Sequence, residues 1–100
     1  MTPPIAIPRK GIAKFCWKHN IRKLSLFGSV LRDDFGPDSD IDVLVEFEPA
    51  ARLSLFDFLR IQEELEGLFE HKVDLVEASA LRNPFRRHEI MRTQQIVYAA

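Results

Sequence analysis

The sequence predicts an α/β (α+β) domain in which helices pack against one small mixed β-sheet. Three apolar runs of strand length, at residues 22–27, 41–47 and 72–77, supply the strands. A helical pattern over residues 54–69 separates the second strand from the third, and a connection of that length joins parallel neighbours. If the first strand runs antiparallel to the second, the sheet is mixed. The 100 residues suffice for a single domain, 1–100, with one core.

The first third of the chain is expected to contain helix, strand and helix. Pro8 suits the first turn of a helix that ends at Asn20. The apolar stripe of this helix consists of Ile12, Phe15, Cys16 and His19. After the first strand, Gly28 turns the chain and Ser29 caps a short helix over residues 30–35.

The remaining elements carry clear boundary signals. Ser54 caps the crossover helix, with Asp57 at the right distance to help cap it. We expect its buried stripe at Leu55, Phe58, Leu59, Leu65, Leu68 and Phe69. Asn83 caps a last helix that runs to about Arg92, and residues 95–98 then form a short edge strand.

The composition excludes several classes of protein. A net charge of −1 and a pI near 6.3 argue against a nucleic-acid-binding surface, which needs a basic excess to replace condensed counterions. No apolar run approaches the length that spans a bilayer, and the N-terminus lacks the pattern of a signal peptide. The single cysteine, Cys16, cannot form an internal disulfide, so we expect it in the core of a cytoplasmic protein.

A Gly-Ser pair comes directly after the first strand. Gly28 leaves room for the main chain to turn, and free N–H groups at the start of the next helix suit an anion such as a nucleotide phosphate. Most Gly-Ser pairs are plain turns, so Gly28 and Ser29 indicate a phosphate site only in combination with the acidic residues of the second strand.

Two carboxylates open the second strand. Residues two apart on a strand point to the same face, so Asp40 and Asp42 project together while Ile41, Val43 and Val45 face a core. Two such charges repel each other unless a cation lies between them, and Mg²⁺ prefers one or two carboxylates plus phosphate oxygens. The alternative is an Asp-rich turn with Asp42 exposed on an edge strand.

A third carboxylate, Asp74, lies early in the third strand. If the second and third strands are parallel, their starts lie at one end of the sheet, and Asp74 can meet Asp40 and Asp42 there. The alternative is an edge strand on which the face that bears Asp74 is simply wet.

Gly28-Ser29 followed after ten residues by Asp40-Ile41-Asp42 resembles the signature of the DNA polymerase β nucleotidyltransferase superfamily. The short chain resembles its minimal nucleotidyltransferases (MNT proteins), many of which are antitoxins of HEPN/MNT toxin–antitoxin pairs. One departure is Arg32-Asp33, where family members often carry Arg-Gly. The resemblance implies the nucleotidyltransferase fold and transfer of a nucleoside monophosphate, such as AMP from ATP, to a hydroxyl.

The resemblance also implies a role for each residue of the motif. Asp40 and Asp42 hold the nucleotide-bound Mg²⁺ and share a second ion with Asp74, which acts as the base. Gly28 and Ser29 fix the β- and γ-phosphates. Arg32 neutralises phosphate charge or, as an alternative, pairs with a nearby Asp or with a partner protein.

Three functions stay open at this point. The first is an antitoxin that adenylylates its cognate HEPN ribonuclease toxin, on a tyrosine in relatives. The second is an antitoxin that acts by forming a complex, without essential catalysis. The third is a small-molecule nucleotidyltransferase, which usually needs an added domain to bind its acceptor. A basic patch in the last helical region is either a solvated face or a docking surface for an acidic partner; its members are Arg82, Arg86, Arg87, His88 and Arg92.

Overall fold

The computed structural model describes residues 7–32 and 35–100. The predicted alternative in which Arg32 pairs with Asp33 or Asp34 therefore lies outside the described residues. The element order is α1 (Arg9–Lys18), β1 (Ile21–Phe27), η1 (Gly28–Leu31), β2 (Ile41–Phe47), α2 (Leu55–Phe69), β3 (Val73–Glu77), η2 (Ala78–Ala80), α3 (Pro84–Thr93) and β4 (Gln95–Ala99). No helix in these two ranges is both long and apolar enough to cross a membrane.

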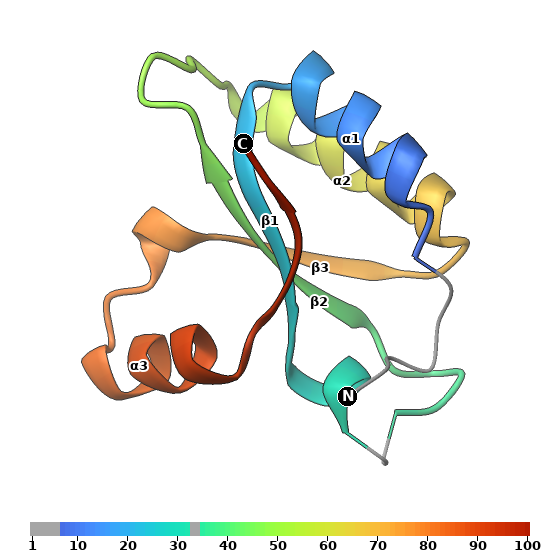
Figure 1. Ribbon diagram of the computed structural model, residues 1–100, viewed down its shortest axis with the longest axis vertical. Helices are drawn as coiled ribbons and strands as arrows, with labels where there is room; N and C mark the ends of the chain where they lie inside the picture. Colours follow the sequence, from blue (N-terminus) through green and yellow to red (C-terminus); the bar gives the residue numbers. More distant parts are fainter. Residues whose placement is uncertain (1–6, 33–34) are drawn as a thin grey trace.

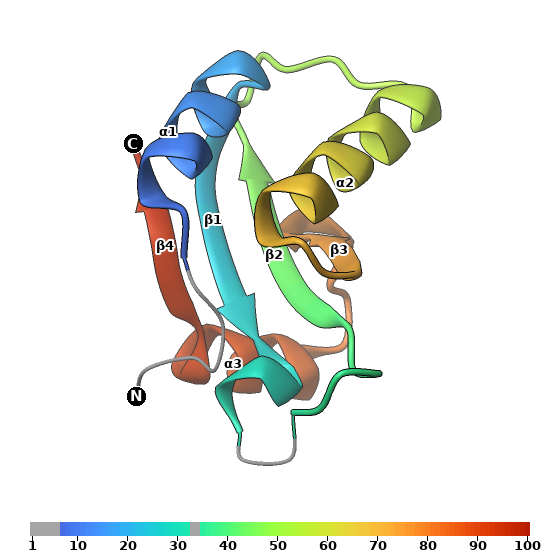
Figure 2. The same cartoon turned by 90° about the vertical axis from the view of Figure 1, so that its right-hand side faces the viewer.

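The strands form one four-stranded sheet in the order β3-β2-β1-β4 (Figure 2). Strand β1 lies antiparallel to both β2 and β4, whereas β2 and β3 are parallel and are joined by α2 as a crossover. The predicted mixed sheet is therefore confirmed, as is the edge position of the last strand. Strand β3 forms the other edge.

The helices are divided between the two faces of the sheet. Helices α1 and α2 lie side by side on one face and α3 lies on the other, as Figures 1 and 2 both show. The larger core lies between the sheet and the α1–α2 pair and includes Ile12, Phe15, Cys16, Leu24, Leu26, Ile41, Val43, Val45, Ile61, Leu65 and Leu75. A smaller cluster beneath α3 consists of Phe27, Leu44, Ala78, Leu81 and Ile90.

The cap signals at the starts of α2 and α3 are confirmed. In α2 the Asp57 N–H donates to Ser54 Oγ at 3.1 Å, and the Ser54 N–H donates to Asp57 Oδ2 at 3.0 Å, which completes a capping box. In α3 the Oδ1 of Asn83 accepts from the N–H groups of Phe85 and Arg86 at 3.0 and 3.1 Å.

The predicted stripe of α2 is wrong at its start. Leu65 and Phe69 are buried as expected, but Leu55 and Leu59 are 72% and 47% exposed. The first turn of α2 stands away from the strands (Figure 2). Phe58 and Leu68 are partly buried against the larger core, and full burial along α2 begins at Ile61.

Helix α1 ends at Lys18, earlier than predicted, and Asn20 adopts a left-handed conformation with φ of 56° that turns the chain into β1. Cys16 is buried as expected. Desolvation by this burial raises the pKa of its thiol to about 12, so the sulfur stays protonated.

Candidate active site

The turn after β1 depends on Gly28. Its φ is +74°, a left-handed conformation that side chains other than hydrogen disfavour. A Cβ added at this position would also lie 2.2 Å from Oδ2 of Asp42, well inside van der Waals contact. Glycine therefore lets the turn adopt its shape and lets the Asp42 carboxylate lie directly against the main chain.

The turn itself differs from the sequence-based prediction. Element η1 is a single 3₁₀ turn that ends at Leu31, and the predicted helix over residues 30–35 is wrong. The Arg32 N–H donates to the Ser29 carbonyl at 2.9 Å, after which Arg32 is extended at φ −116° and ψ 164°. The cap position of η1 is Phe27 and not Ser29, and no side-chain hydrogen bond caps the turn.

Strand registers bring Asp42 and Asp74 together. Asp42 is the register partner of Asp74 across the parallel β2–β3 pair and of Phe27 across the antiparallel β1–β2 pair. The predicted alternation of β2 is confirmed, since Ile41, Val43 and Val45 are fully buried in the larger core. Asp42 and Asp74 thus share the α3 face of the sheet with Leu44 and the end of β1.

Asp40 lies one residue before β2, is exposed, and comes after a turn over residues 36–39. The Gly36 N–H donates to Ser39 Oγ at 3.1 Å, and the ring of His71 donates to the Ser39 carbonyl. This histidine fixes the approach to Asp40 from the start of β3. Sequence reasoning missed it because an isolated histidine carries no spacing signal.

The electrostatics of the site favour a bound cation. Burial raises the pKa of Asp42 above its ordinary value, and the negative charges of Asp74 and Asp40 raise it further. A hydrogen bond from the Ser29 main chain to the Asp42 carboxylate and the positive charge of Arg86 act in the opposite direction. Asp42 is therefore held beside like charges that protein groups neutralise only in part.

This donor set fits Mg²⁺ with a nucleotide better than Mg²⁺ alone. The described residues contain no group of three or more His, Cys, Asp and Glu side chains arranged to hold a metal ion. Mg²⁺ binds through one or two carboxylates when phosphate oxygens and waters complete its octahedron, and the adjacent Asp42 and Asp74 supply that number. The alternative interpretation of Asp74, an exposed residue on an edge strand, also describes its position correctly, because β3 is an edge strand and Asp74 is exposed.

A cleft of about 620 Å³ opens between the η1 turn and α3. Gly28, Leu31 and Arg32 line one wall, and Arg86, Ile90 and Gln94 are among the residues of the other. Its volume lies in the range of small-molecule sites. Arg32, predicted to bind nucleotide, is exposed in this cleft.

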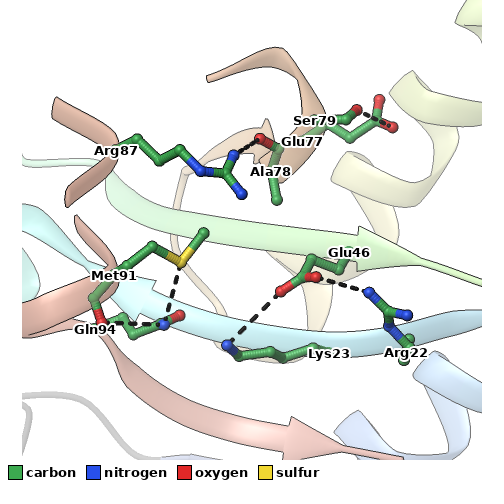
Figure 3. Close-up of polar contacts among 9 residues, drawn as sticks. All are labelled: Arg22, Lys23, Glu46, Glu77, Ala78, Ser79, Arg87, Met91 and Gln94. Carbon is green, nitrogen blue, oxygen red and sulfur yellow. Dashed lines mark hydrogen bonds and ion pairs between the residues drawn. The ribbon is translucent and has the colours of Figure 1, made fainter. Parts of the chain in front are cut away.

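The basic patch of the last helix divides into residues with different surroundings. Arg87 Nη1 donates to the Ala78 carbonyl at 3.0 Å and anchors α3 to η2 (Figure 3). Arg92 pairs with Glu89 at 2.7 Å. Arg86 alone among the five members of the patch lines the cleft. Nothing in the sequence distinguishes Arg86 from its basic neighbours, so the prediction missed it.

Comparison with known proteins identifies a family that matches most of the chain. Residues 9–97 match the family model described as nucleotidyltransferase domain. The protein adenylyltransferase MntA of Thermococcus cleftensis is 39% identical over 66 residues, which cover 66% of this chain and 65% of that protein.

Two solved structures share the fold. A candidate minimal nucleotidyltransferase is 34% identical, with a TM-score of 0.71 over 87% of this chain and 86% of that chain. An MNT antitoxin in complex with a tri-AMPylated HEPN toxin of Shewanella oneidensis is 18% identical, with a TM-score of 0.64 over 92% of this chain and 70% of that chain.

Proposed function

The chain belongs to the nucleotidyltransferase domain family, and on that premise we propose that it is an antitoxin that transfers AMP from ATP to a hydroxyl of a HEPN toxin. Its relative in Thermococcus cleftensis is named as a protein adenylyltransferase, and an MNT antitoxin of the same fold binds a HEPN toxin that carries AMP. The proposal places both proteins in the cytoplasm, where ATP is available, and takes a tyrosine as the acceptor.

The observation that carries the proposal is the packing of Asp42. Its carboxylate lies against the Gly28 turn on one side and in register with Asp74 on the other. This packing supports the proposal because transfer from a metal-bound triphosphate needs phosphate-binding and metal-binding groups side by side.

Each residue receives a role in the reaction. Asp42 and Asp74, with Asp40 just before β2, would hold Mg²⁺ together with the substrate's phosphate oxygens, with two ions when substrate is present. The metal would supply charge neutralisation of the triphosphate and activation of the acceptor hydroxyl. The main chain of Gly28 and Ser29, with Arg32, would hold the β- and γ-phosphates so that the α-phosphorus faces the acceptor. The acceptor oxygen then bonds to the α-phosphorus as the bond to pyrophosphate breaks, and the hydroxyl proton passes to Asp74.

The test combines transfer and neutralisation. The purified protein is incubated with its HEPN partner, Mg²⁺ and ATP labelled at the α-phosphate, and we expect the label on the partner. The double variant Asp40→Ala, Asp42→Ala should bind the partner in a pull-down but transfer no label and fail to relieve toxicity. If that variant neutralises the toxin fully without transfer, neutralisation is by complex formation and the enzymatic account is wrong.

A further inference from the structure

Arg86 lies on the wall of the cleft that faces the Gly-Ser turn. It belongs to the first turn of α3, where its main-chain N–H is held by Asn83 Oδ1 at 3.1 Å. Its side chain lines the same cleft as Gly28 and Arg32. The start of α3 is also anchored by the bond from Arg87 to the Ala78 carbonyl (Figure 3), so the position of Arg86 is fixed by two independent contacts.

The surroundings of Arg86 leave its guanidinium available to a ligand. Its side chain takes part in no hydrogen bond or ion pair within residues 7–32 and 35–100, in contrast to Arg87 and Arg92. The charge of Arg86 nevertheless reaches Asp42, since it lowers the pKa of that carboxyl. An arginine that lines the cleft opposite Gly28 and Arg32, and whose charge acts on Asp42 without an ion pair to it, is suited to an anion that binds between the two walls of the cleft.

We propose that Arg86 binds the terminal phosphates of the nucleotide from the α3 side of the cleft, opposite the Gly28 turn. The inference rests on the proposed function and adds to it a residue of α3. A nucleoside triphosphate carries more negative charge than one Mg²⁺ neutralises, and a planar guanidinium can bind two phosphate oxygens at once. On release of pyrophosphate, the same contact stabilises the negative charge of the leaving group.

The experiment compares binding of ATP and AMP by calorimetry in Mg²⁺. We expect Arg86→Gln to raise the Kd for ATP by about tenfold or more, the effect of one lost charge-assisted contact, and to change the Kd for AMP by less than about twofold. Arg86→Lys keeps the charge without the two-pronged geometry and should restore part of the ATP affinity.

The matched control is Arg82→Gln. Arg82 precedes the same helix, is exposed, and does not line the cleft, so its variant removes an equal charge elsewhere. Melting temperatures of all variants check folding. Equal ATP affinity in Arg86→Gln and Arg82→Gln, or equal losses for ATP and AMP, would overturn the role of Arg86 while wild-type transfer still supports the proposed function. A wild-type protein that binds no ATP would overturn both.

Discussion

The two faces of the sheet are built for different tasks although the same strands make both. On the α1–α2 face, β2 contributes Ile41, Val43 and Val45, which are fully buried. On the α3 face, β2 contributes Asp42 and Leu44, of which only Leu44 belongs to the small apolar cluster beneath α3. The α1–α2 face therefore carries most of the stability of the domain. This allows the α3 face to hold like charges together at a cost to stability.

On the α3 face, β2 carries charges at both of its ends, on either side of the buried Leu44. At the end opposite Asp42, Glu46 pairs with Arg22 at 3.0 Å and with Lys23 at 3.7 Å (Figure 3). The charge of Glu46 is therefore balanced by these two cations. Around Asp42 the nearest charges are mostly of the same sign. Within this face, the unbalanced end is therefore the end that would accept metal and nucleotide.

The largest expected effect concerns Asp74 and tests whether this residue acts in catalysis or is only exposed to solvent. Asp74→Asn removes the proposed base, and we expect transfer to the HEPN partner to fall by about 10²- to 10⁴-fold. Asp38→Asn serves as the control, because Asp38 is exposed in the turn before β2 and its variant removes the same charge. Single-turnover transfer assays measure both. Equal rates in the two variants would show that Asp74 is only an exposed edge residue.

The next effect tests which face carries the stability. Leu65→Ala removes a fully buried side chain from the larger core, and we expect a loss of about 2–5 kcal/mol in the free energy of unfolding. Ile90→Ala, in the smaller cluster, should cost less, because Ile90 and its neighbour Phe27 line the open cleft and the site can relax into it.

The control for both variants is Leu59→Ala, which truncates a side chain that is 47% exposed and should cost about 0.5 kcal/mol or less. Urea denaturation gives all three values. A cost for Ile90→Ala that equals or exceeds that for Leu65→Ala would contradict the division of labour between the faces.

On both faces of the sheet, the sequence predicts local features better than it predicts how one element docks against another. Strand alternation, the capping box at Ser54 and the Asn83 cap are local signals, and all of them are confirmed. The exposed start of α2 was mispredicted because periodicity identifies an apolar face without showing where the sheet beneath it ends.

The site divides in the same way. The contact between Gly28 and Asp42 follows from the motif and from the predicted antiparallel pairing of the first and second strands. The position of Arg86 depends on how α3 docks across the sheet, and no spacing along the chain encodes that docking.

A third prediction concerns the contact that joins the two halves of the site. Gly28→Ala places a methyl group at a φ of +74° and against the Asp42 carboxylate, so we expect a loss of about 1–3 kcal/mol in stability and a larger loss of transfer activity. Gly36→Ala is the control, since a Cβ there would meet nothing within 4 Å. Thermal melts and transfer assays would contradict the prediction if both variants behaved alike.

The smallest effect is a gain in stability. The raised pKa of Asp42, caused first by burial and then by the charge of Asp74, means that its ionised form destabilises the fold at neutral pH. Asp42→Asn keeps the shape and can still accept the Ser29 hydrogen bond, so the variant should melt a few degrees higher at pH 7 in the absence of Mg²⁺.

The pH dependence of this gain has a definite sign. The relevant pH window lies between the ordinary pKa of an aspartate and the raised pKa of Asp42. In this window the folded protein binds more protons at Asp42 than the unfolded chain does. The contribution of Asp42 to the free energy of unfolding therefore increases as the pH falls through the window. The carboxyls of Glu64 and Glu89 have lowered pKa values and act in the opposite direction, which is why the difference between wild type and Asp42→Asn is measured. That difference should shrink on acidification and also on addition of Mg²⁺, which stabilises only the wild type. If the difference in melting temperature changes with neither pH nor Mg²⁺, the charge of Asp42 is already neutralised within the protein. The α3 face would then carry no unbalanced charge, and the contrast with the α1–α2 face would fail.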